Sequence, residues 1–158
     1  MHFTPGQLRE IVGLSVETYR HWRRVLPPFL NRRGYAPCFS IGDLLAASIL
    51  RRLTDNCGVR VGHLKKISAE ISRFCNASSW AALEGRMLVV DISGGTCWTV
   101  KDQSEARSQD IAISCPLDPI LTELRDALLR SQPSAGESQL MFPLTEIGSG
   151  SRRRGERA

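Results

Sequence analysis

Five arginines stand within 14 residues near the start of the 158-residue chain. A guanidinium group carries a permanent positive charge and a planar fork of N–H donors, which can bind a phosphate or the N7 and O6 atoms of guanine. A charge run is usually a solvated helix face, but here two short capped helices and a Gly-Tyr loop accompany it. The cluster therefore predicts contacts with a nucleic acid. Its members are Arg20, Arg23, Arg24, Arg32 and Arg33.

The charge of the chain is concentrated in its first half. The formal net charge is +5 and the sequence pI is about 9.3, which are modest values for the whole molecule. Residues 1–75 hold 12 Lys/Arg against 5 Asp/Glu, whereas residues 76–130 hold 5 against 8. We therefore expect residues 1–75 to bind a polyanion and the middle of the chain to do something else.

Two short helices are predicted to position the arginines. Residues 4–7, Thr-Pro-Gly-Gln, have the pattern of an N-cap, a proline at the first helical position and a capping-box partner. Gly13 is a natural left-handed end for this helix. Ser15 then caps a second helix, which Pro27-Pro28 ends because neither ring can donate a helical N–H.

The second helix should have an inner and an outer face. Val16, Tyr19 and Trp22 are three residues apart and are predicted to face the first helix, which leaves the arginines on other faces. Trp22 is a core residue in one interpretation and a hydrogen-bond donor to phosphate in the other, as is Tyr35. His21 either reads a base edge or is simply solvated.

Two further helices should complete the first half. Ser40 and Asp43 form a second capping-box pattern, and Gly58 is expected to close the helix that they open. A fourth helix is predicted over about residues 61–74, and residues 80–85 suggest a short helical turn. The apolar stripe of the third helix comprises Ile41, Leu44, Leu45, Ile49 and Leu53, and that of the fourth comprises Leu64, Ile67, Ile71 and Phe74.

The middle of the chain changes to a strand pattern. Residues 87–92 and 97–100 are rich in β-branched residues and flank a Ser-Gly-Gly-Thr turn, which predicts a β-hairpin. Residues 110–115 could supply a third strand. A last helix over about residues 118–130 carries a leucine stripe that either packs on the hairpin or forms a dimer seam. From Ser131 onward the composition predicts a disordered tail, assigned to residues 132–158.

Several short stretches together match a known pattern. They are Phe3-Thr-Pro-Gly-Gln-Leu8, Gly13-Leu-Ser15, Thr18-x-Arg20-x-Trp22, Leu26-Pro-Pro28, Arg33-Gly-Tyr35, Phe39-Ser40, Asp43-Leu44 and Gly58-Val59. The span from Phe3 to about Ile71 resembles the winged helix-turn-helix DNA-binding domain of MerR-type transcription regulators. The resemblance implies that residues 15–24 are a recognition helix in the major groove, with Thr18, Arg20 and His21 as base or phosphate contacts. It also implies that residues 32–35 form a wing over the DNA backbone.

The chain departs from this family in two places. Ala36-Pro37 stands where a basic residue commonly follows the Gly-Tyr pair, so that phosphate contact has no counterpart here. The long antiparallel coiled coil through which members usually dimerise is replaced by the hairpin and a short leucine-spaced helix. The family's mode of dimerisation and its promoter-untwisting mechanism are therefore not carried over.

The sequence thus predicts an α+β protein with three segments. Residues 1–75 are expected to form a winged helix-turn-helix of four short helices with a wing, and residues 76–131 a small β-hairpin/helix domain for dimerisation or signal input. The predicted function is a sequence-specific DNA-binding transcription regulator; the alternatives are an architectural factor of the excisionase or packaging type and a protein-docking module. The predicted DNA-binding residues are Thr4, Ser15, Thr18, Tyr19, Arg20, His21, Arg23, Arg24, Arg32, Arg33 and Tyr35.

The expected partners are double-stranded DNA, a second copy of the chain, and RNA polymerase or another protein at the middle domain. No nucleophile elbow, phosphate loop or His-Glu-x-x-His motif occurs, so we expect no enzyme and no cofactor. The five cysteines are scattered without a Cys-x-x-Cys pair, which favours reduced, mostly buried thiols; convergence on a metal or a redox role is the alternative. No long apolar run or signal-peptide pattern is present, and we expect a cytoplasmic protein without membrane contact.

Overall fold

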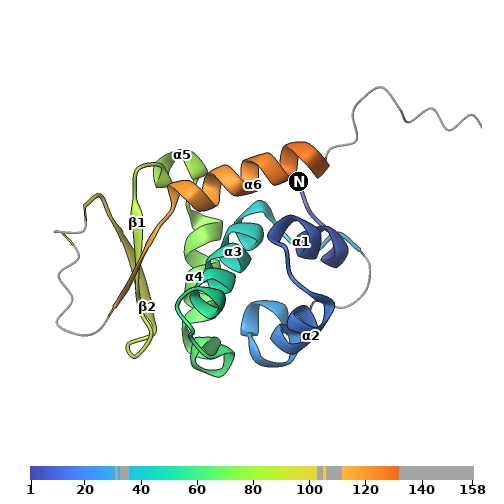
Figure 1. Cartoon of the computed structure of the whole chain (residues 1–158), viewed down its shortest axis with the longest axis horizontal. Coiled ribbons are helices and arrows are strands. Elements are labelled where there is room, and N and C mark those ends of the chain that lie inside the picture. Colours follow the sequence, from blue (N-terminus) through green and yellow to red (C-terminus); the bar gives the residue numbers. More distant parts are fainter. Residues whose placement is uncertain (31, 33–35, 103–104, 106–111, 132–158) are drawn as a thin grey trace, which may run out of the picture.

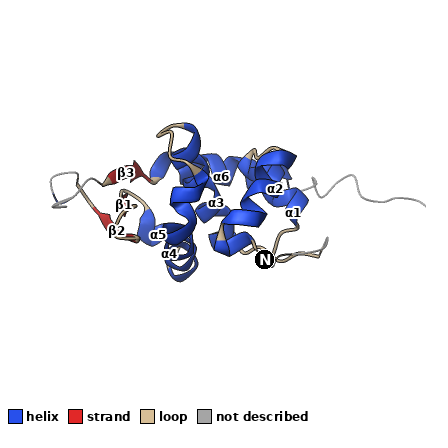
Figure 2. Cartoon of the chain, turned by 90° about the horizontal axis from the view of Figure 1, so that it is seen from below, coloured by secondary structure: helices blue, strands red, loops and turns tan. Residues whose placement is uncertain are grey.

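The computed structural model of the protein describes residues 1–30, 32, 36–102, 105 and 112–131. This part of the chain is a mixed α+β structure with six α-helices and a three-stranded antiparallel sheet. The sheet lies at one end of the molecule and α1 and α2 lie at the other (Figures 1 and 2). Predictions for the tail over residues 132–158 fall outside the described residues.

The elements follow one another as helices, then strands, then a final helix. Their bounds are α1 (Pro5–Val12), α2 (Val16–Val25), the 3₁₀ helix η1 (Pro27–Phe29), α3 (Ile41–Asp55), the 3₁₀ helix η2 (Val61–His63), α4 (Leu64–Ala77), α5 (Trp80–Leu83), β1 (Met87–Asp91), β2 (Thr96–Val100), β3 (Ile113–Pro116) and α6 (Asp118–Ser131).

The predicted caps of the first two helices are confirmed. The Thr4 hydroxyl accepts from the Gln7 backbone N–H at 3.2 Å, and the Gln7 side chain accepts from the Thr4 N–H at 2.9 Å. Gly13 has φ 72°, the left-handed conformation that ends α1. Ser15 caps α2 by accepting from the Thr18 N–H at 3.0 Å. Local residue types therefore determine where both helices begin.

The third helix begins as predicted but differs at two positions. Ser40 and Asp43 form the expected capping box. Ile41 is 41% exposed rather than part of the buried stripe, because helical side chains tilt toward the N-terminus and that of the first residue projects beyond the helix end. The helix ends at Asp55 with Asn56 as its cap, and Gly58 lies in the following turn with φ 66°.

The fourth helix begins three residues later than predicted. A single 3₁₀ turn, η2, occupies residues 61–63, and α4 runs from Leu64 to Ala77. Its inner face buries Leu64, Ile67 and Ile71 completely, whereas Phe74 is only partly buried. This face packs on α3 and against η1, so α4 is a wall of the core.

The hairpin and the third strand form one sheet with β1 in the centre. The strand order is β2-β1-β3, with Val89 opposite Trp98 on one side and Ser114 on the other. Leu88 and Val90 point to the face that joins the hydrophobic core of the helices. The sheet contacts α4 through β2. The expected third strand is confirmed from Ile113, and residues 110–111 lie outside the described part.

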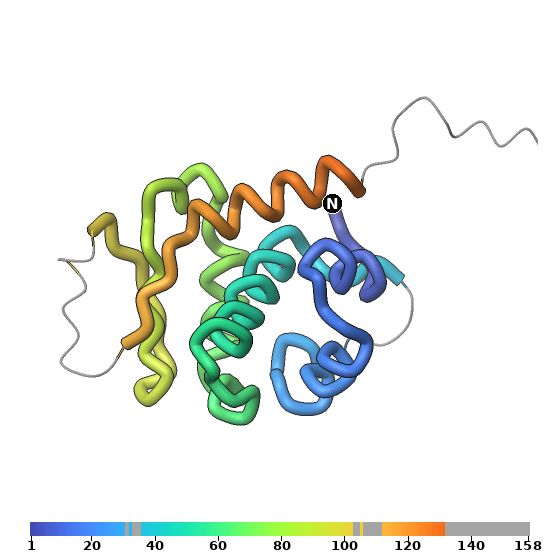
Figure 3. Tube along the Cα trace, in the orientation of Figure 1, coloured from blue at the N-terminus to red at the C-terminus, as the bar shows by residue number. Residues whose placement is uncertain are grey.

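The last helix has its most extensive contacts with two other helices. α6 lies across α3 and α1, as the chain trace in Figure 3 shows. Leu117, Leu121 and Leu124 are at most 2% exposed and belong to the same core cluster as Leu8 of α1. The strand residues Leu88 and Val90 belong to this cluster as well. Leucine spacing defines an apolar face but not the surface that receives it, so the contacts with α1 and α3 could not be predicted from it. Leu117, Leu121 and Leu124 are thus covered within one chain, whereas Leu128 is only partly buried. The domain boundary predicted near residue 75 falls inside α4.

All five cysteines are free thiols. Cys75 and Cys115 are buried, Cys38 and Cys97 are partly buried, and Cys57 is exposed. Among the described residues, no group of three or more His, Cys, Asp or Glu side chains could hold a metal ion. None of the described helices is long and apolar enough to cross a membrane.

Candidate nucleic-acid interface

The helix α2 has one buried and one exposed face. Tyr19 and Trp22 are 5% and 0% exposed and pack among Phe29 and Phe39. Arg20, His21 and Arg24 are exposed on the other side. Because a helix turns once every 3.6 residues, the spacing that buries the two aromatic rings directs these basic side chains to solvent.

The exposed face of α2 carries positive charge that the described protein does not neutralise. Neither Arg20 nor Arg24 has a carboxylate partner among the residues that the structure describes. By contrast, Arg51 of α3 pairs with Asp55 at 3.1 Å and Arg52 pairs with Glu123 at 2.6 Å. Guanidinium groups without partners remain free to bind an external anion.

The hydroxyl of Tyr19 does not reach this exposed face. It is buried and has no hydrogen-bond partner among the residues that the structure describes. Burial raises the pKa of Tyr19, and the nearby Arg23 partly opposes that rise. The Arg23 guanidinium carbon lies 6.0 Å from the centre of the Tyr19 ring, and Arg23 is itself partly buried. Tyr19 therefore supports the charged face from beneath, although the sequence placed it among the DNA-contacting residues.

Two of the three small hydroxyl residues of the predicted site serve as helix caps. Thr4 caps α1, and Ser15 caps α2. The Ser15 hydroxyl also donates to the Thr18 hydroxyl at 2.9 Å. Ser15 is exposed and Thr18 is partly buried at the start of α2, so both lie at the end of the helix where N–H groups and the helix dipole favour a phosphate.

The described part of the predicted wing turns back toward the protein. Arg32 forms an ion pair with Asp43 at 3.2 Å, donates to the Cys38 carbonyl and lies 4.9 Å from the centre of the Phe39 ring. These contacts engage its guanidinium group on three sides. Arg32 is thus placed as an anchor, whereas Arg33 and Tyr35 lie outside the described residues.

Two basic residues beside α2 were not selected from the sequence. Arg60 precedes η2 and His63 ends it, and both are exposed. Because η2 packs against α2, their side chains lie next to the arginine-bearing helix. The excess of positive charge in residues 1–75 was the only sequence signal for them, because no local pattern links this turn to a helix about 40 residues earlier.

No protein-family model, curated protein or solved structure matches this chain. The candidate interface is therefore defined by its own geometry, which combines the exposed basic face of α2 with the turn before α4.

Proposed function

We propose that the protein is a sequence-specific DNA-binding transcription regulator in which α1 and α2 form a helix-turn-helix with a MerR-like wing. The observation that carries this proposal is the exposed face of α2, whose cations have no carboxylate partner in the described part of the chain. The buried side chains of Tyr19 and Trp22 hold α2 in a fixed position, as a recognition helix requires.

The dimensions of α2 suit the major groove. Its ten residues give a length of about 15 Å, and the groove is about 12 Å wide, which admits one helix. In this placement Arg20 and His21 reach base edges, with Arg20 suited to the two acceptors of guanine. Arg24 and Arg60 would contact phosphates on either side and contribute affinity without reading sequence.

The remaining predicted residues take supporting roles. Ser15 and Thr18 at the start of α2 would hold a phosphate at the helix N-terminus. We assign Arg32 to holding the loop against α3, because its guanidinium group is already engaged by Asp43. Arg33 and Tyr35 are proposed as wing contacts on the strength of the sequence resemblance alone.

The proposal is tested by selection from fragmented genomic DNA at near-physiological salt, followed by sequencing of the retained fragments. We expect a few enriched sites with an inverted repeat, which would indicate a dimer. Neutralising six phosphates would give a slope of about −5 in a plot of log affinity against log salt concentration. Retention without a motif would instead favour an architectural role, and no retention would contradict DNA binding.

One variant distinguishes recognition of the DNA sequence from non-specific electrostatic binding. Arg20→Ala should cost about 1–3 kcal/mol of binding to the selected site and relax preference at one base pair. The matched control is Arg73→Ala on α4, whose side chain is 74% exposed and pairs with Glu70. Equal losses in the two variants would remove Arg20 from the reading face.

A further inference from the structure

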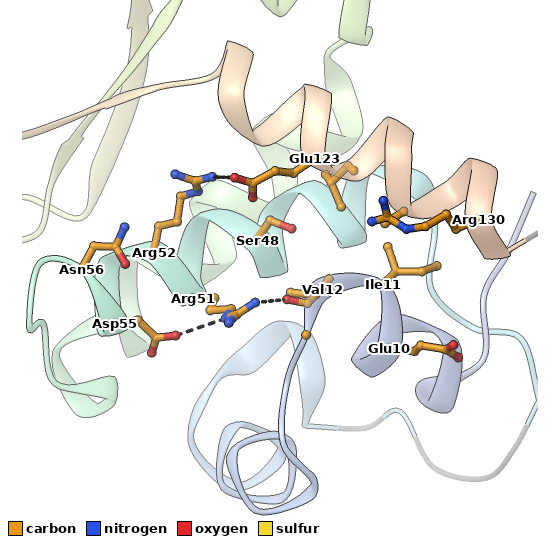
Figure 4. A pocket seen from close by; sticks show the side chains of 13 residues that line it. Glu10, Ile11, Val12, Ser48, Arg51, Arg52, Asp55, Asn56, Glu123 and Arg130 are labelled. Carbon is orange, nitrogen blue, oxygen red and sulfur yellow. Dashed lines mark hydrogen bonds and ion pairs between the residues drawn. The ribbon is translucent and has the colours of Figure 1, made fainter.

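A cleft of about 420 Å³ lies between the end of α1, the C-terminal half of α3 and α6. Its apolar wall is made by Ile11, Leu124 and Ala127, and its polar wall contains three arginines, Arg51, Arg52 and Arg130 (Figure 4). The cleft also contains the carboxylates of Glu10, Asp55 and Glu123, so most of its lining is polar or charged. Its volume lies in the range of sites for small ligands.

The arginines of the cleft are only partly neutralised. Arg52 is more buried than its partner Glu123, whose side chain is 71% exposed, and Asp55, the partner of Arg51, is 55% exposed. Ion pairs with such exposed carboxylates contribute little, so an incoming anion can replace them. Arg130 points toward Ile11 in Figure 4 and has no carboxylate partner among the described residues.

We propose that this cleft binds a small organic anion, a carboxylate or a phosphate ester, that bridges α6 to α3. The anionic group would lie on the guanidinium fork of Arg130, which can bind two oxygens at once. The ligand would extend along α3 toward Arg52, which lies at the opposite end of the cleft in Figure 4. The apolar part of the ligand would cover Ile11 and Ala127, which are partly exposed. Glu10 also lines the cleft, and in the view of Figure 4 its carboxylate points away from the Arg130 guanidinium.

The cleft is joined to α2 through Arg51. The guanidinium of Arg51 donates to the Val12 carbonyl at the end of α1 and lies against Gly13, in the turn that leads to α2. A ligand that draws Arg51 toward the cleft therefore acts on the residue that holds this turn. This second step, in which ligand binding changes affinity for DNA, rests on the proposed function, whereas the anion site itself does not.

Binding is tested with the full chain and defined probes. Calorimetric titration would compare phenyl phosphate and benzoate with benzyl alcohol, which has the ring but no charge, and with inorganic phosphate, which has the charge but no ring. We expect saturable binding of at least one organic anion at one site per chain. The probe that binds identifies the ligand as a phosphate ester or a carboxylate. Failure of both to bind, or equal binding of benzyl alcohol or inorganic phosphate, would overturn the proposal.

Three variants locate the site. Arg130→Gln should lower the affinity for the organic anion by about tenfold or more, because it removes a charge-assisted pair of hydrogen bonds. Arg73→Gln on α4 should have no effect, and neither should Arg20→Ala, which reports on the basic face of α2. Equal weakening by Arg20→Ala would place the anion on α2 and contradict a site in the cleft.

Coupling to DNA is measured separately with the selected DNA site and a saturating probe. A change of about fivefold or more in DNA affinity, lost in Arg130→Gln, would support coupling through Arg51. Unchanged DNA affinity would overturn the coupling while leaving the anion site established. If the protein binds no DNA at all, the proposed function fails and the titration still decides the anion site.

Discussion

Arg32 and Asp43 join the segment after η1 to the first turn of α3 through an ion pair of 3.2 Å. The Asp43 side chain is 7% exposed, and that of Arg32 is 33% exposed. The same carboxylate accepts from the Ser40 backbone N–H at 2.9 Å and from the Asn76 amide at 3.0 Å. One buried charge thus holds together a loop, the start of α3 and the end of α4.

Asp43→Ala is expected to lower the free energy of unfolding by about 3 kcal/mol, because it leaves the Arg32 charge and several donors without a partner. Urea unfolding followed by circular dichroism measures the loss. The control is Asp55→Ala, which breaks an exposed pair and should cost less than about 1 kcal/mol. Similar losses in the two variants would show that Asp43 does not anchor the loop.

Tyr19→Phe is expected to raise the free energy of unfolding by about 1 kcal/mol, since the buried Tyr19 hydroxyl has no hydrogen-bond partner in the described part of the chain. Thermal unfolding of the two proteins provides the comparison. Tyr19→Ala should instead cost about 3–5 kcal/mol, because the ring packs edge-on against Phe29 and Phe39. A lower stability of Tyr19→Phe, or a weaker affinity for DNA, would mean that the hydroxyl has a partner after all.

Gly13→Ala and Gly58→Ala form a matched pair. Both residues have positive φ, 72° and 66°, so each alanine should cost about 1–2 kcal/mol in backbone conformation. A Cβ at Gly13 would also lie 2.5 Å from the Arg51 guanidinium, whereas nothing lies within 4 Å of one at Gly58.

Arg51 must therefore give up its bond to the Val12 carbonyl in Gly13→Ala, and we expect a further loss of about 1 kcal/mol. Chemical denaturation of both variants, alone and combined with Arg51→Ala, measures this difference. The extra loss should disappear in the Arg51→Ala background. Its persistence there would assign the cost to the backbone alone.

The cysteines should differ strongly in reactivity. Cys57 is exposed, whereas burial raises the pKa of the Cys75, Cys97 and Cys115 thiols and so reduces their thiolate fraction. Treatment with iodoacetamide at pH 8, followed by mass spectrometry, should modify Cys57 first and Cys75 last. Rapid modification of Cys75 would indicate that the contact between α4 and the sheet opens readily.

The thiol of Cys97 also predicts a pH dependence of stability. Burial, together with Glu70 and against the effect of Arg73, raises its pKa from 9.0 to about 11. The folded protein therefore keeps a proton that the unfolded chain loses, so this contribution to stability is complete below pH 9 and declines as the pH rises toward 11. Urea unfolding between pH 8 and pH 11 should show a steeper decline for the natural chain than for Cys97→Ala. Parallel curves would contradict the raised pKa.

The local features of the fold could be predicted from the sequence because they depend on neighbouring residues. Thr4, Ser15 and Ser40 mark helix starts through bonds that reach only three residues ahead. The hairpin follows in the same way from β-branched runs around Gly94-Gly95. Burial of Tyr19 and Trp22 likewise follows from their spacing along one helix.

The relationships between distant segments could not be predicted in this way. Nothing near Arg32 in the sequence indicates that Asp43 engages its guanidinium group, and without that contact Arg32 looks like any other cation of the cluster. The same holds for Arg60, which becomes part of the candidate interface only because η2 packs on α2. The burial of Leu117, Leu121 and Leu124 depends on contacts with residues that are distant in the sequence, such as Leu8. No local pattern indicates these contacts.

The contact of α6 with α1 and α3 can form only late in the synthesis of the chain. A ribosome releases α1 and α3 long before residues 118–131, so the apolar surface that α6 covers stays open until nearly all of the described chain has emerged. Long-range contacts of this kind slow folding, because the intervening chain must be ordered before they form. A chain truncated within the sheet would therefore contain the basic helix α2 but lack the helix α6 that completes the core. Such a fragment would expose apolar surface and would be a substrate for chaperones or proteases.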